Sequence, residues 1–126
     1  MALVAALGLA GAAGGSTGRV ATLQADVAEW SIVPSTGSVA AGRVRIVVRN
    51  LGYQAHQVTL VRTSSFDQRL PLRGHRALVH AIVQTAVVKS GGRAALEVTL
   101  KPGSYLLLDN LPWHYWKGTS VAFTVS

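Results

Sequence analysis

The sequence predicts an all-β domain, a Greek-key β-sandwich of about seven to eight short strands. Two patterns lead to this prediction. Apolar and polar residues alternate through most of the chain after Val20, as they do in strands that bury one face. Short clusters of Gly, Pro, Asn and Ser separate the alternating runs. At 126 residues the chain is long enough for one domain with its own core.

Each alternating run directs one apolar set of side chains inward. The first run includes Glu29 as part of the strand and ends at Pro34. In the second run Arg43, Arg45 and Arg49 point outward, and a slip of one residue would bury them. The predicted inward sets, in chain order, are Leu23, Ala25 and Val27; Val44, Ile46 and Val48; His56, Val58 and Leu60; Ala94, Leu96, Val98 and Leu100; Tyr105, Leu107 and Asp109; and Val121, Phe123 and Val125.

The middle of the chain, residues 63–90, is open to more than one interpretation. Residues 66–70 could form a single helical turn that ends before Pro71. The apolar spacing within residues 78–83 suits a short helix, but residues 81–88 could equally form a strand.

The composition limits the possible chemistry. The absence of cysteine excludes disulfides, thiolate zinc sites, iron–sulfur clusters and a cysteine nucleophile. Lys and Arg outnumber Asp and Glu by 12 to 5, for a net charge of +7. This charge suits an anionic surface or an acidic partner, although solubility alone explains it equally well. The chain has no phosphate-binding loop, no Ser–His–Asp order and no pattern of stacking aromatics, so we expect neither an enzyme nor nucleic-acid binding.

The N-terminal segment indicates export. Residues 1–15 are apolar without charged side chains, and they are shorter than the about 20 residues that span a bilayer. We therefore expect residues 1–18 to be a signal peptide with a short linker, residues 19–126 to be the folded domain, and the protein to be periplasmic or secreted. No Lys or Arg precedes the apolar run. Either the true start lies upstream, or the signal is a weak one.

The C-terminal segment contains a loop with a specific spacing of residues. Asp109 follows an apolar strand, His114 lies in an aromatic stretch after Pro112, and Thr119 precedes the last strand. This arrangement resembles the copper-binding loop of the cupredoxins, the small blue copper proteins, in which Cys, His and Met occur in this order between two strands. Asp109 stands where the Cys would be, and Thr119 where the Met would be.

The resemblance extends upstream and covers roughly residues 26–126. The Gly42 turn, the Asn50–Gly52 turn, His56 and the Pro102–Gly103 corner follow one another as in that family. The chain is therefore identified as a degenerate member that lacks the Cys and Met ligands. The resemblance implies a cupredoxin-like sandwich over residues 19–126.

The resemblance also implies a metal site formed by His56, Asp109 and His114. A blue copper centre joins two His, one Cys and a weak axial Met. A carboxylate in place of the thiolate leaves two nitrogen donors and one oxygen, which suit Cu(II), and Zn²⁺ is a second possibility. Thr119 is a possible weak axial ligand. The alternatives are hydrogen-bonded core histidines, an Asp109 that only caps a surface turn, a Thr119 that fills space, and a chain that binds no metal.

Three further residues are assigned by the same comparison. Asn50 would connect the ligand loops through hydrogen bonds, unless it only forms an ordinary Asn-x-Gly turn. His75 and His80 lie outside the family's ligand positions, and we expect neither to bind metal.

The expected function is copper carriage or buffering by an exported, monomeric protein, rather than fast electron transfer. The alternatives are a metal-free recognition module and a degenerate relative of blue copper electron carriers. In the resembling proteins the loop around this His docks partners, so Trp113, Tyr115 and Trp116 are the predicted docking residues. A basic rim could surround them if the middle segment lies at the same end of the sandwich. Its residues would be Arg69, Arg73, Arg76 and Lys117.

Overall fold

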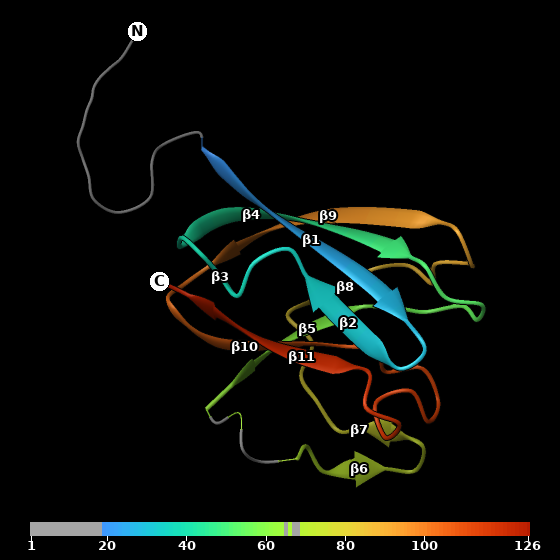
Figure 1. The fold of residues 1–126 in the computed structure, drawn as a ribbon. Coiled ribbons are helices and arrows are strands. Elements are labelled where there is room, and N and C mark those ends of the chain that lie inside the picture. The colour runs from blue at the N-terminus through green and yellow to red at the C-terminus, as the bar shows by residue number, and fades with distance from the viewer. Residues whose placement is uncertain (1–18, 65, 67–68) are drawn as a thin grey trace, which may run out of the picture.

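The chain folds into a β-sandwich, shown by a computed structural model that describes residues 19–64, 66 and 69–126 (Figure 1). The described residues form eleven strands and no helix. The strands are β1 (Val20–Ala28), β2 (Ser31–Pro34), β3 (Ser38–Val39), β4 (Gly42–Asn50), β5 (Thr59–Thr63), β6 (Leu72–Arg73), β7 (Arg76–Ala77), β8 (Val83–Gln84), β9 (Arg93–Leu100), β10 (Gly103–Leu108) and β11 (Ser120–Val125). The count exceeds the seven to eight predicted because four of these strands are only two residues long.

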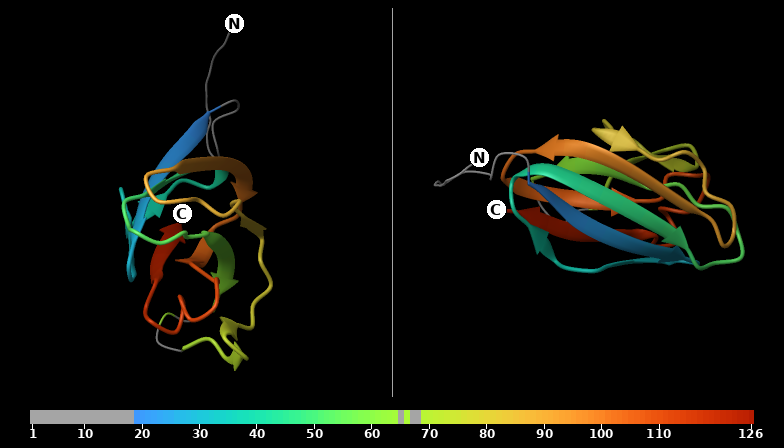
Figure 2. Two further views of the ribbon diagram at one scale, coloured as in Figure 1. Left: turned by 90° about the vertical axis from the view of Figure 1, so that its right-hand side faces the viewer. Right: turned by 90° about the horizontal axis from the view of Figure 1, so that it is seen from above.

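Two sheets form the layers of the sandwich. One has the strand order β2-β1-β4-β9, and the other has the order β3-β11-β10-β5-β8. The β1–β4 and β3–β11 pairs are parallel, whereas β4–β9 and β10–β11 are antiparallel. Figure 2 shows the two sheets stacked face to face. The short β6–β7 hairpin lies apart from both sheets, below them in Figure 1.

The core lies between the sheets and confirms the predicted inward sets. Leu23, Ala25 and Val27 are fully buried, and Val44, Ile46 and Val48 are at most 1% exposed. From the opposite sheet Tyr105, Leu107 and Phe123 join the same cluster, and the Tyr105 and Phe123 rings stack at 5.6 Å. The alternation therefore predicts the register of the main strands correctly.

A second apolar cluster covers the outer face of β10. Leu106 and Leu108 pack there with Val61, Ala77 and Tyr115. Ala77 belongs to the β6–β7 hairpin and Tyr115 to the loop before β11. This packing holds the hairpin against the end of the sandwich that carries His114.

The prediction that the first strand continues to Pro34 is wrong. β1 ends at Ala28, and β2 runs back antiparallel beside it with Ser31 opposite Ala28. Glu29 and Trp30 form the turn and are joined by a cis peptide bond. Alternation did not reveal the reversal because apolar residues recur on both sides of a turn that has neither Gly nor Pro.

The middle segment agrees with the strand alternative. No helix occurs within residues 69–90, and β8 lies inside the 81–88 range. The possible helical turn at 66–70 includes residues 67 and 68, which lie outside the described part of the chain. The predicted signal peptide and linker, residues 1–18, also lie outside it. No helix among the described residues is long and apolar enough to cross a membrane.

Candidate metal centre

The three predicted ligands meet at one end of the sandwich. His56 lies in the loop between β4 and β5 and exchanges both backbone hydrogen bonds with Val88. Asp109 directly follows β10, and its N–H donates to the carbonyl of Thr119 at 3.0 Å. His114 lies in the tight turns that connect Asp109 to β11. The ends of β4, β5, β10 and β11 thus determine where these side chains lie.

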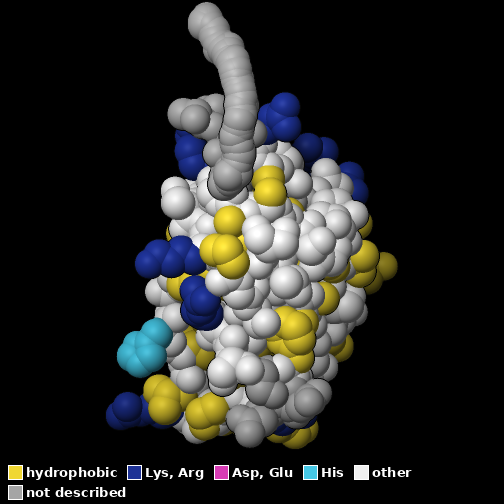
Figure 3. Space-filling view, turned by 90° about the vertical axis from the view of Figure 1, so that its left-hand side faces the viewer, with side chains coloured by type: hydrophobic (Ala, Val, Ile, Leu, Met, Phe, Trp, Pro, Cys, Tyr) yellow, Lys and Arg dark blue, Asp and Glu magenta, His cyan; other side chains and the backbone are white. Residues whose placement is uncertain are grey.

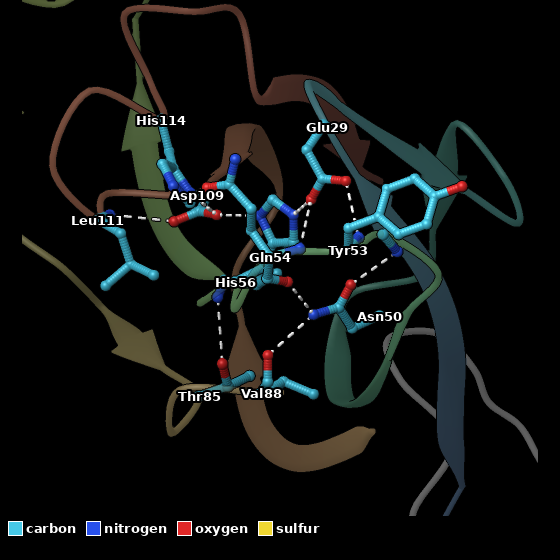
Figure 4. Close-up of polar contacts among 12 residues, drawn as sticks. Glu29, Asn50, Tyr53, Gln54, His56, Thr85, Val88, Asp109, Leu111 and His114 are labelled. Carbon is cyan, nitrogen blue, oxygen red and sulfur yellow. Dashed lines mark hydrogen bonds and ion pairs between the residues drawn. The ribbon is translucent and has the colours of Figure 1, made fainter. Parts of the chain in front are cut away.

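Both imidazoles contact the same carboxylate oxygen. Oδ2 of Asp109 lies 2.6 Å from Nδ1 of His56 and 2.6 Å from Nδ1 of His114 (Figure 4). The three donor atoms lie within 4.8 Å of one another. His56 and Asp109 are fully buried and His114 is 7% exposed. The two nitrogens and one oxygen form a compact donor set that suits Cu(II) or Zn²⁺.

The other oxygen of Asp109 holds the loop. Oδ1 accepts the backbone N–H of Leu111 at 3.0 Å. Asp109 therefore caps the turn, as the alternative interpretation expected, but it is fully buried and not a surface carboxylate. One side chain both shapes the His114 loop and faces both imidazoles.

Glu29 is a member of the site that the sequence did not indicate. Its Oε2 lies 2.5 Å from Nε2 of His56. Both ring nitrogens of His56 therefore face a carboxylate oxygen. The one available signal was that Glu29 is among only five acidic residues in the chain and precedes an aromatic residue, Trp30.

The surroundings keep Glu29 ionised. The backbone N–H of Tyr53 is the main cause that lowers the pKa of Glu29 from 4.5 to about 2. Partial desolvation opposes this effect, while His56 and the N–H of Gln54 add to it. The Glu29 side chain is 17% exposed. A fixed negative charge thus lies behind His56 at neutral pH.

Asn50 supports the His56 loop from beneath. Its amide nitrogen donates to the carbonyls of Gln54 and Val88, at 2.8 and 2.9 Å. Its amide oxygen accepts the N–H of Gly52 at 2.8 Å, which is the turn of the alternative interpretation. Asn50 therefore forms the turn and also joins it to Val88, the backbone partner of His56, but these bonds do not reach the Asp109–Thr119 loop.

Thr119 lies beside Asp109 with an unused hydroxyl group. The residue is fully buried, and its Oγ1 has no hydrogen-bond partner among the described residues. A buried hydroxyl without a partner is uncommon in folded proteins. The observation is compatible with the predicted weak axial role.

Trp30 covers the two imidazoles from the β1–β2 turn. Its ring meets His114 edge to face at a centroid distance of 4.9 Å, and His56 at 6.3 Å. Nζ of Lys117 also lies over the Trp30 ring, 4.3 Å from its centroid. This contact was not predicted, because the β1–β2 turn itself was not predicted.

The aromatic loop divides into an exposed and a buried part. Trp113 and Trp116 are 45% and 53% exposed. Tyr115 is 6% exposed, and its hydroxyl accepts the N–H of Leu70. Tyr115 is therefore a core residue that cannot belong to an exposed docking surface. His75 is exposed and its ring lies tilted against Trp113, with the centroids 4.5 Å apart, and neither His75 nor His80 belongs to the metal-ligand group.

The basic residues of the middle segment lie at this same end. The N–H of Trp113 donates to the carbonyl of His75, and the Arg69 guanidinium donates to the carbonyl of Trp116. The Asp and Glu side chains of the described residues pair with other partners than these basic residues. Asp26 pairs with Arg49, Glu97 with Arg43 and Arg45, and Glu29 and Asp109 with the histidines of the site. Lys and Arg side chains also stand out on the face shown in Figure 3, where no acidic side chain is visible.

Comparison with solved structures identifies the fold. Auracyanin from the photosynthetic bacterium Roseiflexus castenholzii superposes with a TM-score of 0.64 at 21% identity, over 83% of this chain and 96% of that one. Auracyanin A from Chloroflexus aurantiacus, described as a "blue" copper protein, gives 0.63 at 17% identity, over 86% and 100%. Rusticyanin from Thiobacillus ferrooxidans gives 0.58 at 14% identity, over 86% and 79%.

No protein-family model matches the sequence, and neither does any curated protein. The likeness is therefore one of three-dimensional structure at low sequence identity. Auracyanin and rusticyanin are cupredoxins, and the strands and loops that hold His56, Asp109 and His114 in this chain belong to the cupredoxin fold.

Proposed function

We propose that this protein binds Cu(II) through Nδ1 of His56, Nδ1 of His114 and the carboxylate of Asp109, and that it carries or buffers copper outside the cytoplasm. The observation that supports this proposal is the single oxygen of Asp109 that lies 2.6 Å from both Nδ1 atoms. Three donors of types that bind copper are thereby brought together before any metal arrives.

The donor set favours storage or transport over rapid electron transfer. A thiolate stabilises Cu(I) and supplies strong electronic coupling, and this chain has no cysteine. A carboxylate oxygen is a hard donor that favours Cu(II). Zn²⁺ suits the same three donors, so the metal has to be identified by competition.

The surroundings fit a metal ligand set. Metal-binding histidines usually donate their second ring N–H to a carboxylate, and His56 has Glu29 in that position. Thr119 adds a buried hydroxyl with no other partner among the described residues. When bound, the metal would supply Lewis acidity and, as copper, a redox centre, while the residues hold and shield it.

A second candidate function is supported by a different observation. Asp109 satisfies both imidazoles without a metal, and Trp113 and Trp116 remain half exposed nearby. These features favour a metal-free recognition module that binds a partner through the exposed tryptophans.

Metal titration separates the two candidates. The full chain, freed of metal by chelation, is titrated with Cu(II) and Zn²⁺ in a calorimeter, and the visible spectrum is recorded. We expect one tight Cu(II) site without an intense blue band. A variant with His56→Ala and His114→Ala serves as the control for binding at His75 and His80. Equal binding by the wild type and this control would contradict the copper proposal and favour the recognition module.

A further inference from the structure

The turn between β1 and β2 brings an acidic side chain to the metal centre from an element that carries none of the predicted ligands. Oε2 of Glu29 lies 2.5 Å from Nε2 of His56, on the side of the ring away from Asp109. A carboxylate only accepts hydrogen bonds, so in the metal-free chain the Glu29 contact requires a proton on Nε2, just as the Asp109 contact requires one on Nδ1. A metal replaces the proton on the nitrogen that it binds, and Nδ1, which faces Asp109 and His114, is the nitrogen that can bind it while Nε2–H stays bonded to Glu29 (Figure 4).

Glu29 is itself held in place by the backbone. Its Oε1 accepts the N–H of Tyr53 at 2.7 Å, and its Oε2 accepts the N–H of Gln54 at 3.1 Å. Gly52 contributes by having no side chain, because a Cβ there would overlap the Glu29 carboxylate. Residues 52–54, before His56, therefore form a binding site for the Glu29 carboxylate.

We propose that Glu29 is a positioning residue of the metal centre, which holds the Nε2–H of His56 and the orientation of its ring so that Nδ1 is presented to the metal. The part of this inference that concerns metal affinity rests on the proposed function. The part that concerns the hydrogen bond from Nε2–H of His56 to Glu29 does not, since this contact is present in the metal-free chain. Loss of such an outer carboxylate commonly weakens metal binding about 10–100-fold.

A purely structural role for Glu29 makes a different prediction. As a clamp for residues 52–54 alone, Glu29 would affect stability but leave the Nε2–H signal of His56 and the metal affinity unchanged. The two roles are separated by long-range ¹H–¹⁵N spectra of the histidine side chains, recorded on the metal-free full chain at one neutral pH.

Two variants and two matched controls test the proposal. Glu29→Gln keeps the shape of the side chain but replaces one acceptor oxygen by a donor group. Gly52→Ala keeps Glu29 itself and places a methyl group where its carboxylate lies. Glu97→Gln removes the same charge from an exposed ion pair with Arg43. Gly37→Ala makes the same backbone change where a Cβ meets no atom within 4 Å.

We expect Glu29→Gln and Gly52→Ala to weaken Cu(II) binding about 10–100-fold and to disturb the Nε2–H signal of His56, while both controls match the wild type. Wild-type affinity together with a wild-type Nε2–H signal in both test variants would overturn the proposal. If the wild type itself binds no metal, the proposed function fails and the positioning role is decided by the Nε2–H signal alone. An unchanged Nε2–H signal in Glu29→Gln and Gly52→Ala would then overturn that role, and a disturbed signal would support it.

Discussion

Nδ1 of His56 lies 2.6 Å from Oδ2 of Asp109, although the two residues are 53 positions apart in the sequence. The same oxygen lies 2.6 Å from Nδ1 of His114. One carboxylate thus joins the loop before β5 to the loop before β11. In a blue copper centre the metal makes this connection between the two imidazoles. In this chain Asp109 connects the two imidazoles by hydrogen bonding. The site is therefore closed without a metal, and it still presents three donor atoms that a metal could bind.

Loss of either predicted histidine ligand should abolish tight Cu(II) binding. His56→Ala and His114→Ala each remove one of two imidazole donors, so each should reduce affinity by more than the about 100-fold that an outer partner can contribute. Competition titration against a chelator of known affinity measures the change. His75→Ala and His80→Ala are the controls, since both residues are exposed and outside the cluster. A loss confined to the control variants would place the copper elsewhere.

The sequence was sufficient to predict the core and the loop that carries Asp109 and His114. Strict alternation around Val44, Ile46 and Val48 leaves one possible register, and the structure buries these residues as expected. The resemblance to the cupredoxin copper-binding loop singled out Asp109, His114 and Thr119, which the structure brings to one end of the sandwich.

The sequence was not sufficient to predict what surrounds that loop. Glu29 and Trp30 reach the site only because β1 reverses after Ala28, and no Gly or Pro marks that turn. Nothing in the local sequence distinguishes Tyr115 from the exposed aromatic residues beside it. Its ring is buried by packing with Val61, Leu106 and Leu108, and its hydroxyl accepts the N–H of Leu70, which lies on a segment far away in the sequence.

The ion pair between Asp26 on β1 and Arg49 on β4 should make the free energy of unfolding depend on pH in the acidic range. Hydrogen bonds from Arg49, chiefly, lower the pKa of Asp26 below 3.8. The folded state therefore holds this proton less readily than the unfolded state. The stabilisation is fully present above that unfolded pKa and is lost as the pH falls through the lower folded pKa.

Asp26→Asn tests this dependence. The two hydrogen bonds from Arg49 measure 2.9 and 2.8 Å, and the pair is only partly exposed. We expect the variant to lose about 0.5–1 kcal/mol in the free energy of unfolding at pH 7, and clearly less near pH 2. Urea titrations at both pH values measure the difference. An equal loss at both would show that the charge of Asp26 contributes nothing.

The exposed and buried aromatics of the His114 loop should respond differently to truncation. Tyr115→Ala removes a buried ring and the acceptor of the Leu70 N–H, so we expect a loss of about 3 kcal/mol in stability. Trp113→Ala with Trp116→Ala removes half-exposed rings and should cost about 1 kcal/mol or less. Thermal and urea unfolding measure both effects.

The same double variant tests the recognition module. If the exposed tryptophans anchor a partner, the folded double variant should lose that partner in co-purification from the exported fraction, because exposed Trp is a frequent source of binding energy, about 2 kcal/mol or more per residue. A loss of several kcal/mol in the stability of the double variant would instead make the tryptophans structural, and the recognition module would lose its support.

Replacing Asp109 by Cys should convert the site into a coloured copper centre. Both imidazoles already direct Nδ1 at the Asp109 side chain, and the supporting contacts from Asn50 and Glu29 do not involve it. The cysteine sulfur would lie one bond closer to the backbone than Oδ2, which leaves space for an ion between the sulfur and the two nitrogens. The exchange loses the hydrogen bond from the N–H of Leu111, at a cost of about 1 kcal/mol.

Asp109→Cys alone should therefore bind Cu(II) with a visible thiolate charge-transfer band, because the axial ligand tunes such a centre more than it builds it. Adding Thr119→Met should shift the band and the reduction potential. It should also cost stability, since Thr119 is fully buried and a larger side chain must be accommodated, typically for about 1–3 kcal/mol. Asp109→Ser is the control, with a similar size and no thiolate. A folded Asp109→Cys variant that binds Cu(II) but stays as colourless as Asp109→Ser would mean that the His56 and His114 loops cannot reach a copper–thiolate geometry. The cupredoxin likeness of this chain would then be limited to its fold, and the recognition module would become the better explanation of its exposed tryptophans.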